Sequence, residues 1–174
     1  YNLNLFANSR LKEFFLAAFC GRLSRAQMVE QANRFADRVV ERGMTEAGKR
    51  KLRDAREAGN RVLIVTASLA VYVVPLANRL GIPEEDVVAT EIAWDENERV
   101  VGCLVGPNRH GEAKLDGLRA WGNRTGLHRI DVVYSDHHSD LPLLVAAQRG
   151  VAINPTPRLN AEAAARSLEV EIWK

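Results

Sequence analysis

Five polar side chains stand at the ends of predicted strands or at the start of a predicted helix. Thr66 and Ser68 close a short apolar run that is rich in β-branched residues, and Lys114 comes later in the chain. Asp136 and Asp140 follow a second apolar run. A hydroxyl and an ammonium group can hold phosphate oxygens, whereas carboxylates hold Mg²⁺ through oxygen ligands. These residue types therefore indicate phosphoryl transfer with Mg²⁺ as the cofactor.

Buried parallel strands are the elements that would position these side chains. The runs 61–65 and 130–134 are short, continuous and apolar, which is typical of strands that are buried on both faces. A helical pattern follows each run, and two further short strands are predicted. These helices are 69–80 and 141–148, and these strands are 151–153 and 170–172. Such alternation predicts βαβ units, whose strands present ligand-binding groups at their carboxyl ends.

The segment between the two apolar runs completes the predicted α/β part. The ranges 87–93 and 100–105 flank a polar turn and predict a hairpin. A helix is predicted at 113–123, with Lys114 in its first turn. A charge-rich helix at 45–58 precedes the first strand.

Residues 1–43 show only helical patterns. Apolar side chains recur at helical spacing up to residue 19, and Ser24 with Gln27 forms a capping signal for a second helix. Gly43 is the predicted end of that helix. No strand is expected in this block, so the sequence predicts a helical segment followed by an α/β domain.

Each of the polar residues also has an ordinary structural interpretation. Asp140 could cap the helix that begins at Leu141, and Lys114 could be a solvated surface charge. Any one of them alone would more often be structural than functional. The ordered set, hydroxyl then lysine then acidic pair, favours a site.

Three motifs in this order resemble those of a known family. The segments Val-Leu-Ile-Val-Thr66-Ala-Ser, Gly111-Glu-Ala-Lys114 and Val-Tyr-Ser-Asp136-His-His-Ser-Asp140-Leu-Pro-Leu-Leu are similar to motifs two, three and four of the haloacid dehalogenase superfamily. They resemble more narrowly its phosphoserine-phosphatase-like subfamily IB. The resemblance covers about residues 45–160. It implies a Rossmann-like core with a parallel sheet flanked by helices over 44–174, and a partial helical cap over 1–43.

The resemblance also implies a role for each residue. Thr66 would hydrogen-bond the transferring phosphoryl group, within a phosphate-binding segment that includes Ala67 and Ser68. Lys114 would neutralise charge on the nucleophile and the phosphate. Asp136 would bind Mg²⁺ directly, and Asp140 would support the metal site through water. The implied activity is Mg²⁺-dependent hydrolysis of small phosphorylated metabolites.

The first motif of that family, Asp-x-Asp, occurs nowhere in these 174 residues. In the family it supplies the nucleophile and the general acid-base, and it precedes the cap. Because the chain begins with Tyr1, we expect this motif on a segment upstream of the given sequence. The alternative is a catalytically inactive protein that kept the fold and serves in binding or regulation.

The substrate is not determined by these motifs. Phosphoserine phosphatases proper carry Ser-Gly-Gly where this chain has Thr66-Ala67-Ser68, and Gly-Asp-Gly-x-Asn-Asp where it has Ser135 to Asp140. The chain therefore resembles a sister branch, for which L-phosphoserine is only one candidate substrate.

The composition limits which classes of binding partner and which cellular location are expected. The net charge of +2 favours neither a nucleic-acid surface nor an acidic tail. Two cysteines in unrelated contexts, Cys20 and Cys103, indicate reduced thiols and a cytoplasmic protein. No apolar stretch is long enough to span a bilayer.

Two further interpretations, a zinc site and a lipid-binding surface, are less favoured. His137 and His138 could suggest zinc, but adjacent histidines in a tight loop seldom bind the same ion. The apolar side chains of the first helix could meet lipid, although such faces more often contact a protein core. These side chains are Phe6, Leu11, Phe14, Phe15 and Phe19.

Overall fold

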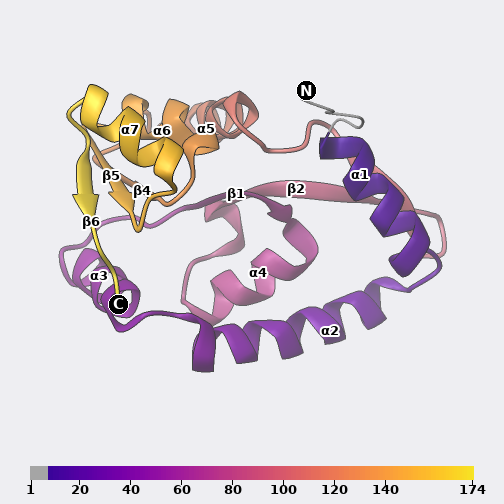
Figure 1. Cartoon of the computed structure of the whole chain (residues 1–174). Helices are drawn as coiled ribbons and strands as arrows, with labels where there is room; N and C mark the ends of the chain where they lie inside the picture. Colours follow the sequence, from indigo (N-terminus) through magenta and orange to yellow (C-terminus); the bar gives the residue numbers. More distant parts are fainter. Residues whose placement is uncertain (1–7) are drawn as a thin grey trace. The chain divides into compact units, whose positions relative to one another are not determined.

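The computed structural model describes residues 8–174, which form two compact units (Figure 1). Unit 1 contains residues 8–43 and Thr66–Arg109, and unit 2 contains Met44–Val65 and His110–Lys174. The division between the units falls inside the first strand. Residues 66–109 thus associate with the helical block, and the division into a cap at 1–43 and a core at 44–174 stays a prediction.

The helices at the start of unit 1 have the predicted character. Helix α1, Asn8–Phe15, continues as a wider π-type turn at Leu16–Cys20, and helix α2 spans Arg25–Arg38. The Ser24 hydroxyl accepts from the backbone N–H of Gln27 at 3.2 Å, and the Gln27 side chain accepts from the Ser24 N–H at 2.9 Å. This capping box is the one that the sequence predicts. A second π-type turn, Val39–Gly43, ends at the predicted glycine.

A three-stranded sheet forms the rest of unit 1, in the order β1-β2-β3. These strands are β1, Ile64–Leu69, β2, Val87–Trp94, and β3, Val100–Val105. The last two form the predicted antiparallel hairpin. Helix α4, Ala70–Arg79, follows β1, and a 3₁₀ turn, Glu84–Asp86, precedes β2. Helices α2 and α4 pack side by side (Figure 1).

The hairpin and the first helical segment share a core. Leu16, Ile92 and Val100 are buried together, and Met28 packs against them from α2. Gly102 has a φ of +89°, and a Cβ there would lie 2.8 Å from the Cβ of Ala17. A glycine is therefore required both by its own backbone conformation and by the close approach of the helical turn to β3.

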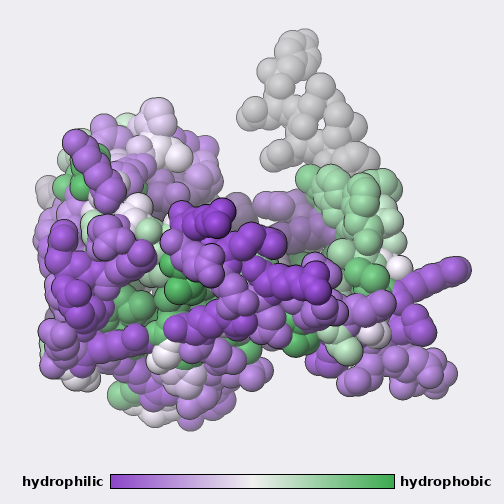
Figure 2. Space-filling view, turned by 90° about the horizontal axis from the view of Figure 1, so that it is seen from below, coloured by the Kyte–Doolittle hydropathy of each residue, from purple (hydrophilic) through white to green (hydrophobic). Residues whose placement is uncertain are grey.

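The opposite face of α1 and its π-type extension carries exposed apolar side chains. Leu11, Phe14, Phe15 and Phe19 are exposed by between 46% and 72%. Figure 2 shows hydrophobic side chains gathered over this segment. The lipid alternative stays untested, and Phe6, which it also includes, lies outside the described residues. No helix within 8–174 combines the length and the apolar character that a membrane span requires.

Unit 2 contains the predicted parallel sheet. Strands β4, Val132–Ser135, β5, Arg149–Ile153, and β6, Glu169–Glu171, are parallel and adjacent in that order. Its helices are α3, Glu46–Glu57, α5, Glu112–Thr125, α6, Leu141–Ala146, and α7, Pro157–Ala165. Helices α6 and α7 pack on the sheet and bury Leu144 and Leu159 completely. The α/β fold class with a parallel sheet flanked by helices is confirmed.

Two details of the predicted architecture are wrong. The sequence predicts that Thr66 and Ser68 close the first strand, but β1 begins at Ile64 and continues through both to Leu69. Moreover, β1 is hydrogen-bonded to β2 and does not belong to the sheet β4-β5-β6. Backbone pairing with β2 extends the strand beyond its apolar run, because ladder hydrogen bonds do not depend on side-chain polarity.

Charged side chains attach α3 to the end of the parallel sheet. Lys51 Nζ lies 3.0 Å from Glu171 Oε1 and 5.6 Å from the centre of the Tyr134 ring. The indole N–H of Trp173 donates to Glu171 Oε2 at 2.8 Å. The hydrogen bonds from Trp173 and Lys51 lower the pKa of Glu171.

We expect Glu171→Gln to reduce the dependence of stability on acid pH. Because the pKa of Glu171 is lower in the folded protein than in the unfolded chain, its stabilisation is present above the unfolded pKa and is lost as pH falls through the folded pKa. The variant should therefore be less stable than wild type at neutral pH, by roughly 1 kcal/mol or less. Below the folded pKa the difference should vanish.

Urea denaturation at several pH values measures this difference. Glu57→Gln is the control, since Glu57 pairs with Arg53 only at 3.9 Å on an exposed face of α3. If the free energies of unfolding of Glu171→Gln and wild type differ by the same amount at all pH values, the pKa of Glu171 does not contribute to stability as proposed.

Candidate active site

The polar centre of unit 2 is an ion pair between Lys114 and Asp140. Lys114 lies in the first turn of α5, and Asp140 lies directly before α6. The ammonium Nζ is 2.6 Å from Oδ1 and 2.7 Å from Oδ2 of the carboxylate. Each residue is only 8% exposed. A buried pair of this kind requires further hydrogen bonds to offset its desolvation.

Two hydroxyl groups supply those hydrogen bonds. Ser135 Oγ, at the end of β4, donates to Asp140 Oδ2 at 2.8 Å, and Ser139 Oγ donates to Oδ1 at 3.2 Å. The Asp140 side chain makes no capping hydrogen bond to α6. The ordinary interpretation of Asp140 as a helix cap is therefore wrong, because its oxygens are directed to Lys114 and the two serines.

Asp136 differs from Asp140 in its surroundings. It follows β4 directly and is exposed, and within residues 8–174 its carboxylate has no hydrogen-bond or ion-pair partner. Its backbone carbonyl accepts from the N–H of Thr156 at 3.1 Å. The main chain of Asp136 is therefore held in place while its carboxylate is open to a ligand.

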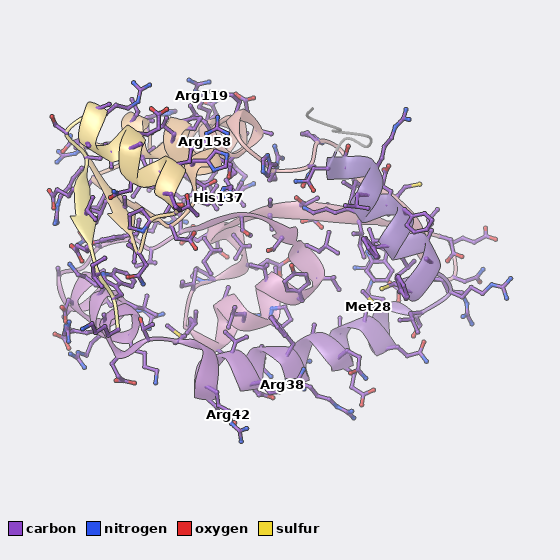
Figure 3. The ribbon with its side chains drawn as sticks, in the orientation of Figure 1. Met28, Arg38, Arg42, Arg119, His137 and Arg158 are labelled. Carbon is purple, nitrogen blue, oxygen red and sulfur yellow. The ribbon has the colours of Figure 1, made fainter. Side chains whose placement is uncertain are left out.

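The two histidines between these aspartates pack against each other. Their ring centres are 4.2 Å apart, and the backbone N–H of Ser139 donates to His137 Nδ1 at 3.2 Å. Helix α7 packs against the turn His138–Asp140, and Figure 3 labels His137 and Arg158 in this unit. Desolvation and the positive charges of Arg158 and the neighbouring histidines lower the pKa of His138. The lowered pKa favours the neutral form of His138.

The predicted phosphate-binding segment lies in unit 1. Thr66, Ala67 and Ser68 are half-buried in β1, and Thr66 Oγ1 accepts from the backbone N–H of Ser68 at 3.1 Å. Lys114, Asp136 and Asp140 belong to unit 2. That all these residues share one site stays a prediction.

Two polar residues that contact the predicted phosphate-binding segment were not identified from the sequence. Thr90 is completely buried in β2, and its hydroxyl donates to the Ala67 carbonyl at 3.0 Å. Its signal in the sequence is a hydroxyl within an otherwise apolar strand. Lys12 contacts the same carbonyl from α1. No local signal distinguishes Lys12 from the other charges of an amphipathic helix.

The carboxylates of unit 2 fit part of a magnesium site. Mg²⁺ prefers oxygen ligands, keeps several waters and is often held by only one or two carboxylates. Asp136 fits a direct ligand because its carboxylate is open. Both oxygens of Asp140 already accept hydrogen bonds, which suits a water-mediated role. Within 8–174 no group of three or more histidine, cysteine, aspartate or glutamate side chains could hold a metal.

The model of the haloacid dehalogenase-like hydrolase family matches residues 2–145. The chain is 29% identical over 158 residues to the phosphoserine phosphatase SerB1 of Mycobacterium tuberculosis, covering 90% of this chain and 50% of that protein. It is 24% identical to a histidinol-phosphatase of Neisseria meningitidis, covering 87% of this chain and 68% of the relative.

Among solved structures, a protein of unknown function from Bordetella pertussis Tohama I superposes with a TM-score of 0.85 at 26% identity. The superposition covers 98% of this chain and 76% of that protein. Nearly all of this chain thus superposes on part of that structure, while the chain spans only half the length of SerB1.

Proposed function

The chain belongs to the haloacid dehalogenase-like hydrolase family, and we propose that the complete protein is a Mg²⁺-dependent phosphomonoesterase that acts on small phosphorylated metabolites. The observation that carries this proposal is the buried Lys114–Asp140 pair, with the open carboxylate of Asp136 on the same loop. Such an arrangement combines a fixed positive charge with a carboxylate that is free to bind a cation.

Each residue has a distinct role in the proposed reaction. Asp140 and its two serine partners hold the Lys114 ammonium in place, so that its charge is preorganised for the phosphate. Asp136 and, through water, Asp140 would hold Mg²⁺, which when bound supplies positive charge to the phosphate oxygens. Thr66, with Ala67 and Ser68, would bind the transferring phosphoryl group.

We place the nucleophile on a strand outside the given sequence, because no Asp-x-Asp occurs within it. Strands β1 and β4 each stand at an end of their three-stranded sheets, which leaves an edge of each available for pairing. The first aspartate of that motif would attack phosphorus while the second gives a proton to the departing alcohol, and water would then hydrolyse the phospho-aspartyl intermediate to release phosphate.

The named activities of two relatives support a small phosphorylated metabolite as the substrate. One relative is a phosphoserine phosphatase and the other a histidinol-phosphatase. Because those substrates differ, the similarity supports the phosphomonoester and not one particular alcohol. The cytoplasmic location stays a prediction.

Phosphate release from an aryl phosphate by the complete protein tests this function. We expect turnover with Mg²⁺ and none when EDTA removes the metal, because carboxylates without a bound cation would repel the phosphate. The 174-residue chain alone should show no turnover, since it lacks the nucleophile. A complete protein that is inactive on a broad panel of phosphorylated metabolites would favour the binding or regulatory alternative.

A further inference from the structure

Lys12 connects helix α1 to the middle of the predicted phosphate-binding segment. Its ammonium donates to the backbone carbonyl of Ala67 and, at 2.6 Å, to Oδ1 of Asn108. Lys12 is half-buried, and all three residues belong to unit 1. Asn108 also lines a cleft of about 530 Å³ between α1 and the segment after β3. The hydrogen-bond partner of Lys12, Asn108, thus also faces a space that a small molecule can enter.

The Ala67 carbonyl is held by a second donor. The buried hydroxyl of Thr90 donates to it at 3.0 Å, and Thr90 Oγ1 itself accepts from the backbone N–H of Arg109 at 3.0 Å. The carbonyl oxygen therefore accepts from two side chains that come from different elements, one of them positively charged. Charge-assisted hydrogen bonds of this kind are the stronger class.

Fixing this carbonyl also fixes the hydroxyl of Thr66. The C=O and N–H of a trans peptide point in opposite directions, so a held Ala67 oxygen directs the N–H of Ser68 to the other side of the strand. That N–H donates to Thr66 Oγ1 at 3.1 Å. A hydroxyl has one proton and two acceptor positions. With one acceptor position taken by Ser68, the rotation of the Thr66 proton is restricted and it is left to donate to another oxygen.

We propose that Lys12 is a positioning residue for phosphate binding, which acts through the Ala67–Ser68 peptide on the hydroxyl of Thr66. This inference rests on the proposed function, because it takes Thr66 as a phosphate ligand. The charge of Lys12 polarises the peptide, which strengthens the hydrogen bond from Ser68 and orients the Thr66 hydroxyl. A lysine that merely tied α1 to the sheet would affect stability and leave phosphate affinity unchanged.

The test uses the complete protein with Mg²⁺ and inorganic phosphate as the probe. Isothermal titration calorimetry of wild type, Lys12→Met and Lys12→Arg measures Kd without any need for turnover. We expect Lys12→Met to weaken phosphate binding by about tenfold, the size of one hydrogen bond to a charged group. Lys12→Arg keeps the charge and the donors and should recover most of the affinity. Lys49→Met is the matched control, since Lys49 pairs with Glu46 on the surface of α3 at 2.8 Å.

A double-mutant cycle tests the route through Thr66. In a Thr66→Ala background, Lys12→Met should lower kcat/KM for an aryl phosphate by less than about twofold, because the hydroxyl that it positions is already absent. An equal loss with and without Thr66 would overturn the proposal. So would a Lys12→Met variant that melts earlier but binds phosphate as wild type does.

The outcomes also separate this inference from the proposed function. Phosphate binding that depends on Lys12, in a complete protein without turnover, would uphold the positioning role and refute the phosphatase. Turnover by the complete protein, together with an unchanged phosphate Kd in Lys12→Met, would uphold the phosphatase and refute the positioning role. A wild-type protein that does not bind phosphate at all would overturn both.

Discussion

Asp136→Asn in the complete protein is expected to abolish Mg²⁺-dependent hydrolysis of an aryl phosphate without changing the melting temperature. The amide lacks the negative charge that a magnesium ligand provides, so the metal should no longer be held. Stability should not change, because the carboxylate of Asp136 is exposed and has no partner within 8–174. The hydrogen bond from the Thr156 N–H goes to the backbone carbonyl, which the substitution leaves in place.

Asp131→Asn is the matched control for this prediction. Asp131 is also exposed and precedes β4, and its carboxylate pairs with Arg129 at 2.6 Å. Steady-state phosphate release and thermal melting of both variants give the comparison. Unchanged turnover in Asp136→Asn would refute its assignment as the metal ligand, whereas equal losses in both variants would show that surface charge alone is responsible.

Lys114→Met is expected to lower both the rate and the stability. The rate should fall by about three orders of magnitude, since a preorganised positive charge at the phosphate is lost. The free energy of unfolding should fall by about 3–5 kcal/mol, because Asp140 would remain buried without its cation. Both residues are 8% exposed, so solvent cannot replace the missing partner.

The double variant Lys114→Met/Asp140→Asn separates the two effects. Removing the buried carboxylate charge as well should restore much of the stability, because no uncompensated ion remains. Turnover should stay as low as in the single variant. Urea denaturation and phosphate release, measured on the same samples, test both statements. A rate loss below tenfold in the single variant would mean that the role of Lys114 is misassigned.

Local sequence signals predicted most of the elements because these signals act within a few residues. The Ser24 cap with Gln27 marks the start of α2, and Gly43 marks the end of the helical block. The apolar runs before Thr66 and Asp136 give strands, although the first begins three residues later than predicted. Helix α7 was not predicted, although Thr156 before a proline is a common start of a helix.

Sheet membership could not be predicted in the same way. Strand β1 has the apolar pattern of a strand buried on both faces, but this pattern does not specify which strand lies beside it. Its neighbour, β2, comes from the predicted hairpin, and no side-chain pattern indicated that pairing. Register and order depend on contacts between distant segments, which a single sequence does not display.

In the candidate site, too, local patterns predict some features, and the others depend on long-range packing. The helix and strand patterns place Lys114 in the first turn of a helix and Asp140 after a strand, whereas their ion pair joins residues 26 positions apart and depends on the packing of α5 beside α6. The contacts of Lys12 and Thr90 with Ala67 span 55 and 23 residues of chain. Such contacts depend on how α1 and β2 pack, so only coordinates could reveal them.

The division into two units determines what a spectroscopic label can report. Both cysteines, Cys20 and Cys103, fall in unit 1, and Cys103 is the more exposed of the two. A thiol-reactive fluorophore would therefore attach to unit 1 alone and react first at Cys103. Of the three tryptophans, Trp121 and Trp173 emit from unit 2 and Trp94 from unit 1, so a Trp94→Phe variant confines the indole emission to unit 2. Dye and indole emission, recorded in one titration, can thus distinguish concerted melting of the two units from melting in sequence.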